Sequence, residues 1–351
     1  MEISFTLPLT VSLRIVNQNA SKQNAYNVIS SLYLSIYFST TDHHMILRVV
    51  ILFLLAKCAF ADNAEREIIW ARTNFPPGFI LDGSAQGTGY GDRLNKYMVK
   101  HLPQFKHTSV IYPNWTRLLL EQQTNKQKVI CSSAFFYRKP GDREDIKDKN
   151  LLSAPNFVFF LHDVIVKKSK RHLYPEEVSF RKLLNNKELK YGFSRIVGPI
   201  YNKVLGDYLG VKDLGELSVE ARLKALHSKK NIIVRLSEDM VEGPLKMILY
   251  DRIDYTLEYE FMVNFVQDKI KSTGELVAIP VKEAKDGISV ASYGCSPHLH
   301  GSEAINAINK VLIRDRNKTV YKENLSYLLP SSDERKKTYW DRYNDLLDMH
   351  N

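Results

Sequence analysis

Seven residues of this 351-residue chain have the types and positions that suit the binding of a small polar molecule. Serine and arginine donate hydrogen bonds, glutamate accepts them, and aromatic rings stack on a bound molecule. The seven candidates are Phe75, Ser132, Ser133, Arg143, Arg195, Glu258 and Tyr259. Such a site must replace the water around its ligand with fixed partners, because unpaired buried polar groups are costly.

The two arginines are the candidates for holding an anionic group. Arg143 carries a planar guanidinium that matches a carboxylate, and we expect it to grip the ligand. The alternative is a surface ion pair with a neighbouring acid, namely Asp142, Glu144 or Asp145. Arg195 lies between an expected strand and an expected helix, where helix N-terminal N–H groups attract anions.

The other five candidates each have a structural alternative. Phe75 belongs to a loop stiffened by two prolines, so its ring could stack on a ligand or simply join the core. Ser132 and Ser133 end an expected strand, where they could face a ligand or serve structural hydrogen bonds. Glu258 and Tyr259 end another strand and could meet an ammonium or hydroxyl group, or could face solvent.

Metal binding and catalysis have weaker support. The segment 295–300 combines Cys295 with His298 and His300, which are possible zinc ligands, but no third well-spaced ligand accompanies the histidines. We therefore expect no metal and no cofactor, and interpret the segment as a histidine-bearing loop. The chain contains no Gly-x-Ser-x-Gly, His-Glu-x-x-His or phosphate-binding glycine motif. Catalysis without such a motif stays open.

The N-terminal region contains a pattern typical of a secretory signal peptide. Met45 to Arg48 is followed by an apolar run and then by the small-x-small triplet Ala59-Phe-Ala61. The run is too short to span a membrane. We expect residues 45–61 to be the signal peptide and residues 1–44 to be a mis-called, disordered extension. A lipoprotein signal at Cys58 is disfavoured by the preceding lysine.

Export would leave two cysteines, Cys131 and Cys295, in a compartment where disulfides persist. One long-range disulfide is the simplest expectation, and two separate buried thiols are the alternative. The formal net charge is +10, with basic and acidic residues interleaved and no nucleic-acid-binding motif. A solvated basic surface explains this charge, and we expect no nucleic-acid partner.

The elements that would position the candidates alternate between strand and helix, which indicates an α/β fold with parallel strands. Up to residue 166, strands are predicted at 67–70, 109–112 and 128–133, helices from Asp92 and at 115–122, and an extended connection at 156–166. Beyond it, strands are predicted at 189–193, 231–234, 253–257 and 287–292, and helices at 200–209, 219–226, 245–248 and 303–312. The stretch 319–347 is predicted to be helical and to lie on the surface.

The order of these elements, together with short motifs, resembles the extracellular solute-binding proteins of family 3, the polar amino-acid transport type. The resemblance covers nearly all of residues 64–315. The segments that carry it are Asn74–Pro77, Gly89–Asp92, Tyr112–Leu118, Ile130–Ser133 with Arg143-Glu144 and Leu152–Pro155, and Tyr250–Tyr255. One departure concerns the position five residues after Asp254, where an acid is expected to hold a ligand ammonium. This chain has Tyr259 there, so it resembles a divergent branch.

The resemblance implies a two-lobed, type II periplasmic-binding-protein-like clamshell with two hinge-crossing strands. Lobe 1 would comprise residues 62–160 and 280–351, and lobe 2 would comprise 161–279. Cys131 and Cys295 would then share lobe 1, which favours their pairing. The implied function is capture of a small anionic or zwitterionic solute in the periplasm by a monomer that delivers it to a membrane permease or sensor. An enzyme on the same scaffold, such as a dehydratase, and an orphan ligand-sensing module are the alternatives.

Overall fold

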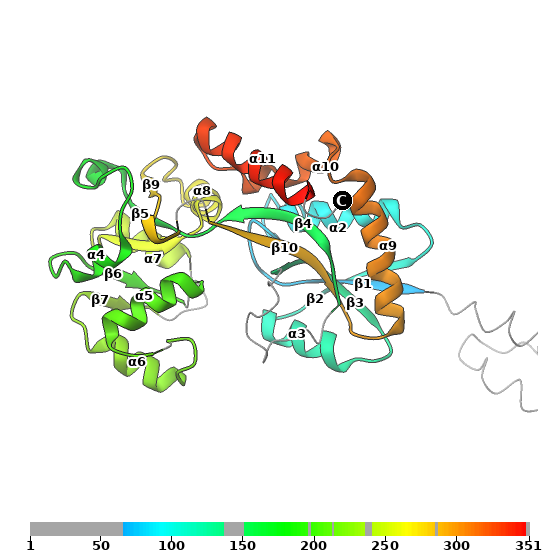
Figure 1. Cartoon of the computed structure of the whole chain (residues 1–351), viewed down its shortest axis with the longest axis horizontal. Coiled ribbons are helices and arrows are strands. Elements are labelled where there is room, and N and C mark those ends of the chain that lie inside the picture. The colour runs from blue at the N-terminus through cyan, green and yellow to red at the C-terminus, as the bar shows by residue number, and fades with distance from the viewer. Residues whose placement is uncertain are drawn as a thin grey trace, which may run out of the picture. The chain divides into compact units, whose positions relative to one another are not determined.

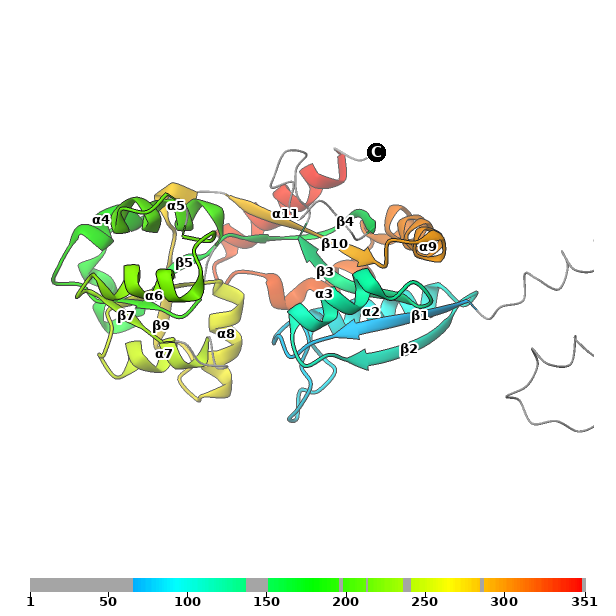
Figure 2. The ribbon, with the colours of Figure 1, turned by 90° about the horizontal axis from the view of Figure 1, so that it is seen from below.

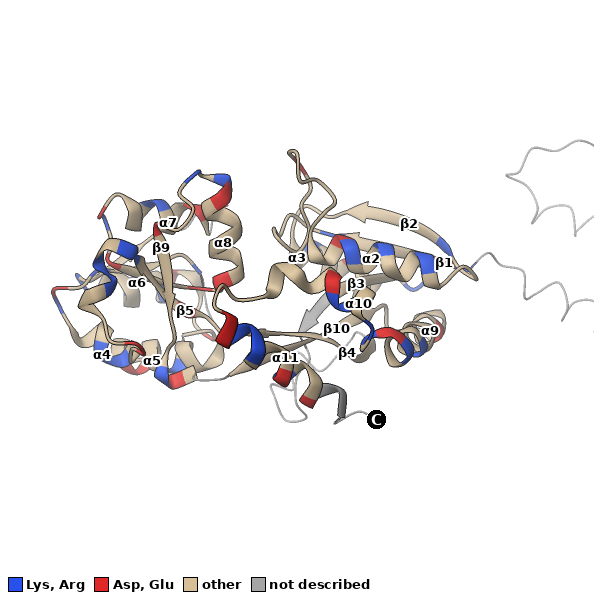
Figure 3. Ribbon diagram, turned by 90° about the horizontal axis from the view of Figure 1, so that it is seen from above, with Lys and Arg blue, Asp and Glu red and all other residues tan. Residues whose placement is uncertain are grey.

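The computed structural model describes residues 66–136, 151–195, 198–212, 214–235, 241–284 and 287–348. Within these ranges the chain forms two five-stranded sheets, and helices connect the parallel strands of each sheet (Figures 1 and 2). Basic and acidic residues are interspersed along the ribbon of both sheets and their helices (Figure 3), in keeping with the interleaved charge of the sequence.

The first sheet has the strand order β2-β1-β3-β10-β4. β1 is parallel to β2 and β3, whereas β10 is antiparallel to β3 and β4. Its strands are β1 (Glu67–Arg72), β2 (Lys106–Ile111), β3 (Val129–Phe136), β4 (Leu151–Phe160) and β10 (Ile288–Cys295). The connecting helices are α2 (Tyr90–His101) and α3 (Trp115–Thr124). α2 buries Leu94 and Met98 against the sheet, as their four-residue spacing predicts.

The second sheet repeats this pattern with the order β7-β6-β8-β5-β9. β6 is parallel to β7 and β8, and β5 is antiparallel to β8 and β9. Its strands are β5 (Asp163–Lys167), β6 (Tyr191–Phe193), β7 (Ile232–Val234), β8 (Tyr255–Glu258) and β9 (Leu276–Ile279). Its α-helices are α4 (Phe180–Asn185), α5 (Pro199–Leu209), α6 (Val219–His227), α7 (Glu242–Leu249) and α8 (Glu260–Lys269). Two short 3₁₀ helices, η3 (Lys168–Leu173) and η4 (Lys282–Ala284), adjoin its strands.

The chain passes between the sheets twice. β4 leads into β5 through Leu161 and His162, and β9 leads back through η4 to β10. The two passages lie side by side, because the backbone N–H of Leu161 donates to the carbonyl oxygen of Gly287 at 3.1 Å. The prediction of two crossing segments is confirmed.

The C-terminal elements complete the core of the first sheet. They are α9 (Leu299–Asp315), α10 (Thr319–Lys322), η5 (Glu323–Leu328) and α11 (Asp333–Asp348). Tyr321, Leu325, Tyr339 and Tyr343 are fully buried in that core. The expectation that residues 319–347 lie on the surface therefore holds for one face of this stretch, and its other face is buried in the core. Aromatic side chains four residues apart, as in Tyr339 and Tyr343, give α11 a buried face despite its many charges.

Arg335 of α11 contacts the first passage between the sheets. Its Nη1 lies 2.8 Å from Oδ2 of Asp163, the first residue of β5, and 2.7 Å from Oε2 of Glu260 in α8. Its guanidinium carbon also lies 4.8 Å from the centroid of the Phe160 ring, at the end of β4. One cation thus contacts the ends of β4, β5 and α8.

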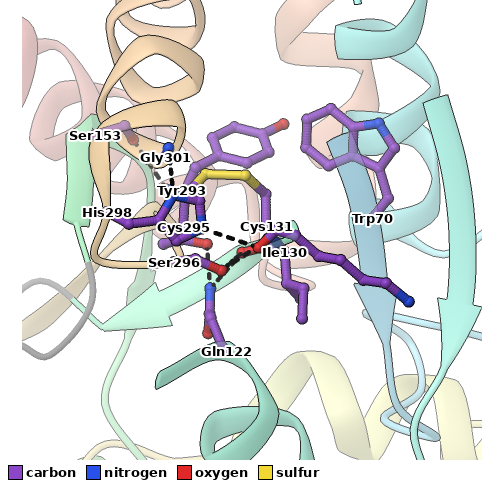
Figure 4. The surroundings of a disulfide bond; sticks show 12 residues. Trp70, Gln122, Ile130, Cys131, Ser153, Tyr293, Cys295, Ser296, His298 and Gly301 are labelled. Carbon is purple, nitrogen blue, oxygen red and sulfur yellow. Dashed lines mark hydrogen bonds between the residues drawn. A yellow bond between two sulfur atoms is a disulfide. The ribbon is translucent and has the colours of Figure 1, made fainter. Parts of the chain in front are cut away.

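Cys131 and Cys295 form a disulfide between β3 and β10 (Figure 4). The two residues are register partners, with their Cα atoms 4.2 Å apart, and the bond lies in the core near Trp70 and Tyr293. Gln122 of α3 also links β3 to β10 through their backbones. Its Nε2 donates to the carbonyl oxygen of Ile130 at 2.9 Å and to that of Gly294 at 2.7 Å. The structure thus has the disulfide rather than two separate thiols.

Some elements differ from the sequence prediction. The predicted extended connection at 156–166 is two strands, β4 and β5, separated by the two residues of the passage. The sequence analysis did not predict α4, α8 or β9. The remaining predicted strands and helices occur where expected, with ends that differ by a few residues.

Candidate functional site

Three of the predicted site residues meet at one edge of the second sheet. Arg195 follows β6, Glu258 ends β8, and Tyr259 is the N-cap residue of α8. β6 and β8 are neighbouring parallel strands, so their carboxyl ends lie at the same edge. In α/β sheets this edge is where ligands commonly bind.

Arg195 and Glu258 form a buried ion pair. Nη2 of Arg195 contacts Oε1 of Glu258, and the two side chains are 17% and 3% exposed. The backbone N–H of Tyr259 donates to the same Oε1 at 2.9 Å, and Nη2 lies 3.8 Å from the sulfur of Met262. Burial raises the pKa of Glu258, and Arg195 opposes that shift. Because the carboxylate is already paired, it does not face solvent as the alternative interpretation supposed.

His162 completes this cluster, although the sequence analysis did not select it. Its ring lies 3.8 Å from the Tyr259 ring, measured between centroids. Tyr201 donates its hydroxyl hydrogen to the carbonyl oxygen of His162, while the imidazole Nδ1 is buried without a partner among the described residues. Burial lowers the pKa of His162 well below its usual value, and the nearby Arg195 charge lowers it further, so the imidazole is neutral at pH 7.

A sequence signal for His162 did exist. His162 and Asp163 are the two consecutive polar residues inside the otherwise apolar run from Phe157 to Val166. Both are buried in the structure. A buried polar pair that interrupts an apolar run indicates either a chain junction or a site, and here the pair marks the passage between the sheets.

Ser132 and Ser133 lie in β3 of the first sheet and are completely buried. Neither hydroxyl oxygen has a hydrogen-bond partner in the described part of the chain. The carbonyl oxygen of Ser133 accepts a hydrogen bond from Nδ2 of Asn156 at 3.1 Å. Backbone pairing therefore positions these serines, and within the described residues their hydroxyls make none of the structural hydrogen bonds that the alternative interpretation requires.

Phe75 lies in a tight turn after β1. Phe75 and Phe79 exchange backbone hydrogen bonds of 3.3 and 2.9 Å around the cis peptide bond between Pro76 and Pro77. The turn packs closely on the start of α2, because a Cβ at Gly89 would lie only 2.4 Å from the carbonyl oxygen of Gly78. The Phe75 ring is half-buried and packs against the first-sheet core.

Asp92 fastens this turn to β1. Its Oδ2 accepts from the backbone N–H of Ile80 at 3.0 Å, and its Oδ1 pairs with Arg72 at 3.1 Å. Asp92 lies in the first turn of α2, as the sequence predicts, where its charge also favours the helix N-terminus. The acid of the Gly89–Asp92 motif therefore positions the loop that carries Phe75.

The predicted site is thus only partly assembled by direct contacts. Arg195, Glu258 and Tyr259 touch one another, and both Phe75 and Tyr259 pack against the same core cluster. Within the described ranges, no hydrogen bond, ion pair or ring contact joins Ser132 or Ser133 to Arg195. Arg143 lies outside the described residues.

The described residues offer little for a metal ion. They contain no group of three or more His, Cys, Asp and Glu side chains placed to hold one. His298 caps α9 instead: its Nδ1 lies 3.4 Å from the backbone nitrogen of Gly301, and its Nε2 lies 3.0 Å from the carbonyl oxygen of Lys128. In the same residues, every helix is too short or too polar to cross a membrane.

Comparison with known proteins gives matches of structure but not of sequence. The sequence matches no protein-family model and no curated protein. The probable amino-acid ABC transporter extracellular-binding protein ytmK from Bacillus subtilis is similar, with a TM-score of 0.52 and 15% identity over 75% of this chain and 97% of that chain. An ancestral cationic amino acid solute-binding protein has a TM-score of 0.50 and 16% identity, over 74% and 94% of the two chains.

A third similar structure concerns glutathione import via GshT and the cystine ABC importer TcyBC of Streptococcus mutans. Its TM-score is 0.50 and its identity 13%, over 78% of this chain and 98% of that chain. At these identities the likeness shows the fold. The predicted two-lobed α/β fold, with a sheet in each lobe and two connecting passages, is confirmed.

Proposed function

We propose that the protein is a solute-binding protein that captures a small polar molecule between two lobes. We assign residues 62–160 and 280–351 to lobe 1 and residues 161–279 to lobe 2. The observation that carries the proposal is the Arg195–Glu258–Tyr259 cluster, which lies at the carboxyl edge of the second sheet and touches the passage between the sheets through His162. The contacts of a site at this position change when one lobe moves against the other.

Binding would work by closure of the lobes. A ligand that contacts residues of both lobes has more contacts in the closed state, so it shifts the population toward that state. Ser132, Ser133, Phe75 and Arg143 are the lobe 1 candidates for those contacts. The two buried serine hydroxyls have no hydrogen-bond partner in the described part of the chain, which supports this role because an unpaired buried hydroxyl is costly unless another molecule satisfies it.

The protein would act outside the cytoplasm, exported by the signal peptide at 45–61. The buried disulfide supports an oxidising compartment such as the periplasm. The similarity to an extracellular-binding protein of an amino-acid ABC transporter supports delivery to such a transporter, and a membrane sensor could recognise the same closed state. We propose that the ligand is released chemically unchanged and that the protein acts as a monomer without a cofactor.

A thermal-shift screen of the full chain tests this function. The panel contains amino acids, organic acids, sugars and oligopeptides, and we expect at least one small polar compound to raise the melting temperature. The compound is then recovered and analysed by mass spectrometry. Recovery of the unchanged compound supports binding, whereas its conversion would identify an enzyme. A panel with no stabilising compound would contradict the proposal.

Variants locate the site. Arg195→Ala removes the lobe 2 cation, and Arg143→Ala removes the lobe 1 cation, so each should abolish or strongly reduce the ligand-induced shift. Arg181→Ala is the matched control, because Arg181 pairs with Asp207 at the surface of the same lobe, where the two side chains are 51% and 43% exposed. An unchanged shift in the Arg143→Ala variant would remove Arg143 from the site.

A further inference from the structure

We propose that lobe 2 selects a ligand group that accepts hydrogen bonds and carries no ammonium, such as a carbonyl, a carboxylate or an acylated amine. The proposal rests on the proposed function and names the chemical class that the lobe 2 cluster recognises. It follows from which hydrogen-bonding atoms of Arg195, Glu258 and His162 are already used and which are not.

One of the two acceptor oxygens of Glu258, Oε1, is already occupied, and an ammonium at the other oxygen would lie next to Arg195. Oε1 of Glu258 accepts hydrogen bonds from Arg195 and from the backbone N–H of Tyr259, and the residue is 2% exposed. An ammonium has three donors and no acceptor. To reach Glu258 it would have to displace Arg195 or lie beside it, and two cations side by side repel each other.

Donors, by contrast, are left over in the cluster. Arg195 carries five N–H hydrogens, and its hydrogen bonds within the described residues all use Nη2. Its Nε is buried without a partner, although the side chain as a whole remains 17% exposed. An N–H of arginine can only donate, so the group that satisfies it must accept.

His162 adds a second unused polar atom. Its Nδ1 is buried and has no hydrogen-bond partner within the described ranges, while its ring is held against Tyr259. A neutral imidazole can donate from Nδ1 or accept there, so it tolerates either a carbonyl or an amide N–H. An acylated amine presents both groups, whereas an ammonium presents only donors.

The charge of the cluster also favours a hydrogen-bond acceptor over an ammonium. The Arg195–Glu258 pair sums to zero, and the imidazole beside it is neutral. Among the described residues, these three groups together supply no net negative charge for a buried ammonium, whose desolvation is costly unless it is paired, and the nearby Asp163 and Glu260 already bind Arg335. A carbonyl or carboxylate oxygen needs only the arginine N–H groups that are still available.

Matched pairs of ligands test the proposal on the full chain by calorimetric titration. The probes are L-glutamate, L-glutamine and L-phenylalanine, each compared with its N-acetyl derivative. We expect the acetylated member of a binding pair to bind at least about tenfold more tightly, because a mispaired buried polar group costs about that much. Tighter binding of the free amino acid overturns this inference and leaves the proposed function standing. No binding by any of these probes or by the panel of the thermal-shift screen overturns both.

The variant Glu258→Gln gives a second test, in which the direction of the change in ligand affinity decides the outcome. Removing the carboxylate charge leaves the Arg195 charge uncompensated, so the affinity for N-acetyl-L-glutamate should rise about tenfold. An affinity for N-acetyl-L-glutamate that falls or stays unchanged in this variant, whatever happens to the affinity for free L-glutamate, overturns the inference. Asp207→Asn breaks the exposed Arg181–Asp207 pair of the same lobe and should change neither affinity. If the Glu258→Gln variant does not fold, the comparison of free and N-acetylated ligands on the unmodified chain still tests the inference.

Discussion

The two sheets have the same strand pattern, but each stabilises its corresponding antiparallel strand pair by a different interaction. In each sheet a strand that arrives from the other sheet pairs antiparallel with the third parallel strand: β10 with β3, and β5 with β8. In the first sheet a disulfide joins that pair. In the second, Asp163 and Glu258 are register partners; Glu258 pairs with Arg195, and Asp163 pairs with Arg335, which it shares with Glu260.

Because of this difference, we expect the stability of the two sheets to depend on different solution conditions. A disulfide is insensitive to moderate changes of pH and is lost on reduction. Two carboxylates at one register position destabilise the pairing of their strands unless cations compensate them, and that balance depends on protonation. The first sheet should therefore respond to redox conditions and the second to pH.

Removing the disulfide should have the largest effect. It closes a loop with a sequence separation of 164, and the loss of such a bond costs about 3–5 kcal/mol. We expect Cys131→Ala with Cys295→Ala to lower the free energy of urea unfolding by that amount. Reductant should destabilise the original chain similarly and leave the double variant unchanged. Equal effects of reductant on both would contradict the assignment.

Removing Arg335 should be the next largest change. Arg335→Met leaves Asp163 and Glu260, whose side chains are 5% and 13% exposed, without their shared cation. An uncompensated buried carboxylate costs about 3 kcal/mol, so urea unfolding at pH 8 should show a loss near that value. Lys336→Met is the control, because Lys336 pairs with Asp333, which is 96% exposed, and its loss should be below about 0.5 kcal/mol. Similar losses in the two variants would refute the role of Arg335.

The pH dependence of the second sheet follows from Asp163. Burial raises its pKa from 3.8 to about 6, although Arg335 opposes the shift. A carboxyl with a raised folded-state pKa takes up a proton on folding between the two values. Its contribution to the free energy of unfolding therefore falls as the pH rises from about 4 to about 6, by at most about 3 kcal/mol.

The variant Asp163→Asn tests this dependence. The free energy of unfolding should fall less steeply between pH 4 and pH 6 than in the original chain. Burial also raises the pKa of Glu258, which contributes a fall of the same sign in both proteins, so their difference isolates Asp163. Parallel pH curves for the two proteins would exclude Asp163 as the titrating group.

Helix caps should give the smallest effects and should be equal in the two sheets. Asn114 caps α3 beside the first sheet by accepting from Arg117 N at 2.8 Å, and Ser218 caps α6 beside the second by accepting from Ala221 N at 3.2 Å. Asn114→Ala and Ser218→Ala should each lower the free energy of unfolding by about 1 kcal/mol. A loss in only one of them, measured by urea unfolding, would show that the sheets unfold separately.

The sequence predicted the parts of the fold that local pattern encodes. Apolar runs located β1, β3 and β7, and the order of elements with short motifs indicated two α/β lobes. Arg195, Glu258 and Tyr259 were selected from their places after predicted strands, and the structure brings them together. These residues lie together because neighbouring parallel strands end at one edge of a sheet; their role in binding stays a prediction.

Other features depend on tertiary contacts that a local pattern does not reveal. Periodicity cannot distinguish one long strand from two strands in line, so the division between Phe160 and Asp163 was not predicted. Residues 319–347 were expected to be helical and on the surface, yet Tyr339 and Tyr343 of α11 are buried because the first sheet offers them a core. His162 was overlooked because its neighbours, Tyr201 in α5 and Tyr259 at the N-cap of α8, are distant in the sequence.

The insertion of one sheet within the sequence of the other also sets the order in which a ribosome can complete them. Every strand of the second sheet has been synthesised by Ile279, whereas the first sheet still lacks β10, at Ile288–Cys295. The second sheet begins later in the sequence than the first sheet, but it is the first of the two that can be completed during translation. Cys131 must meanwhile remain without its partner thiol while the intervening chain, a separation of 164 residues, is made.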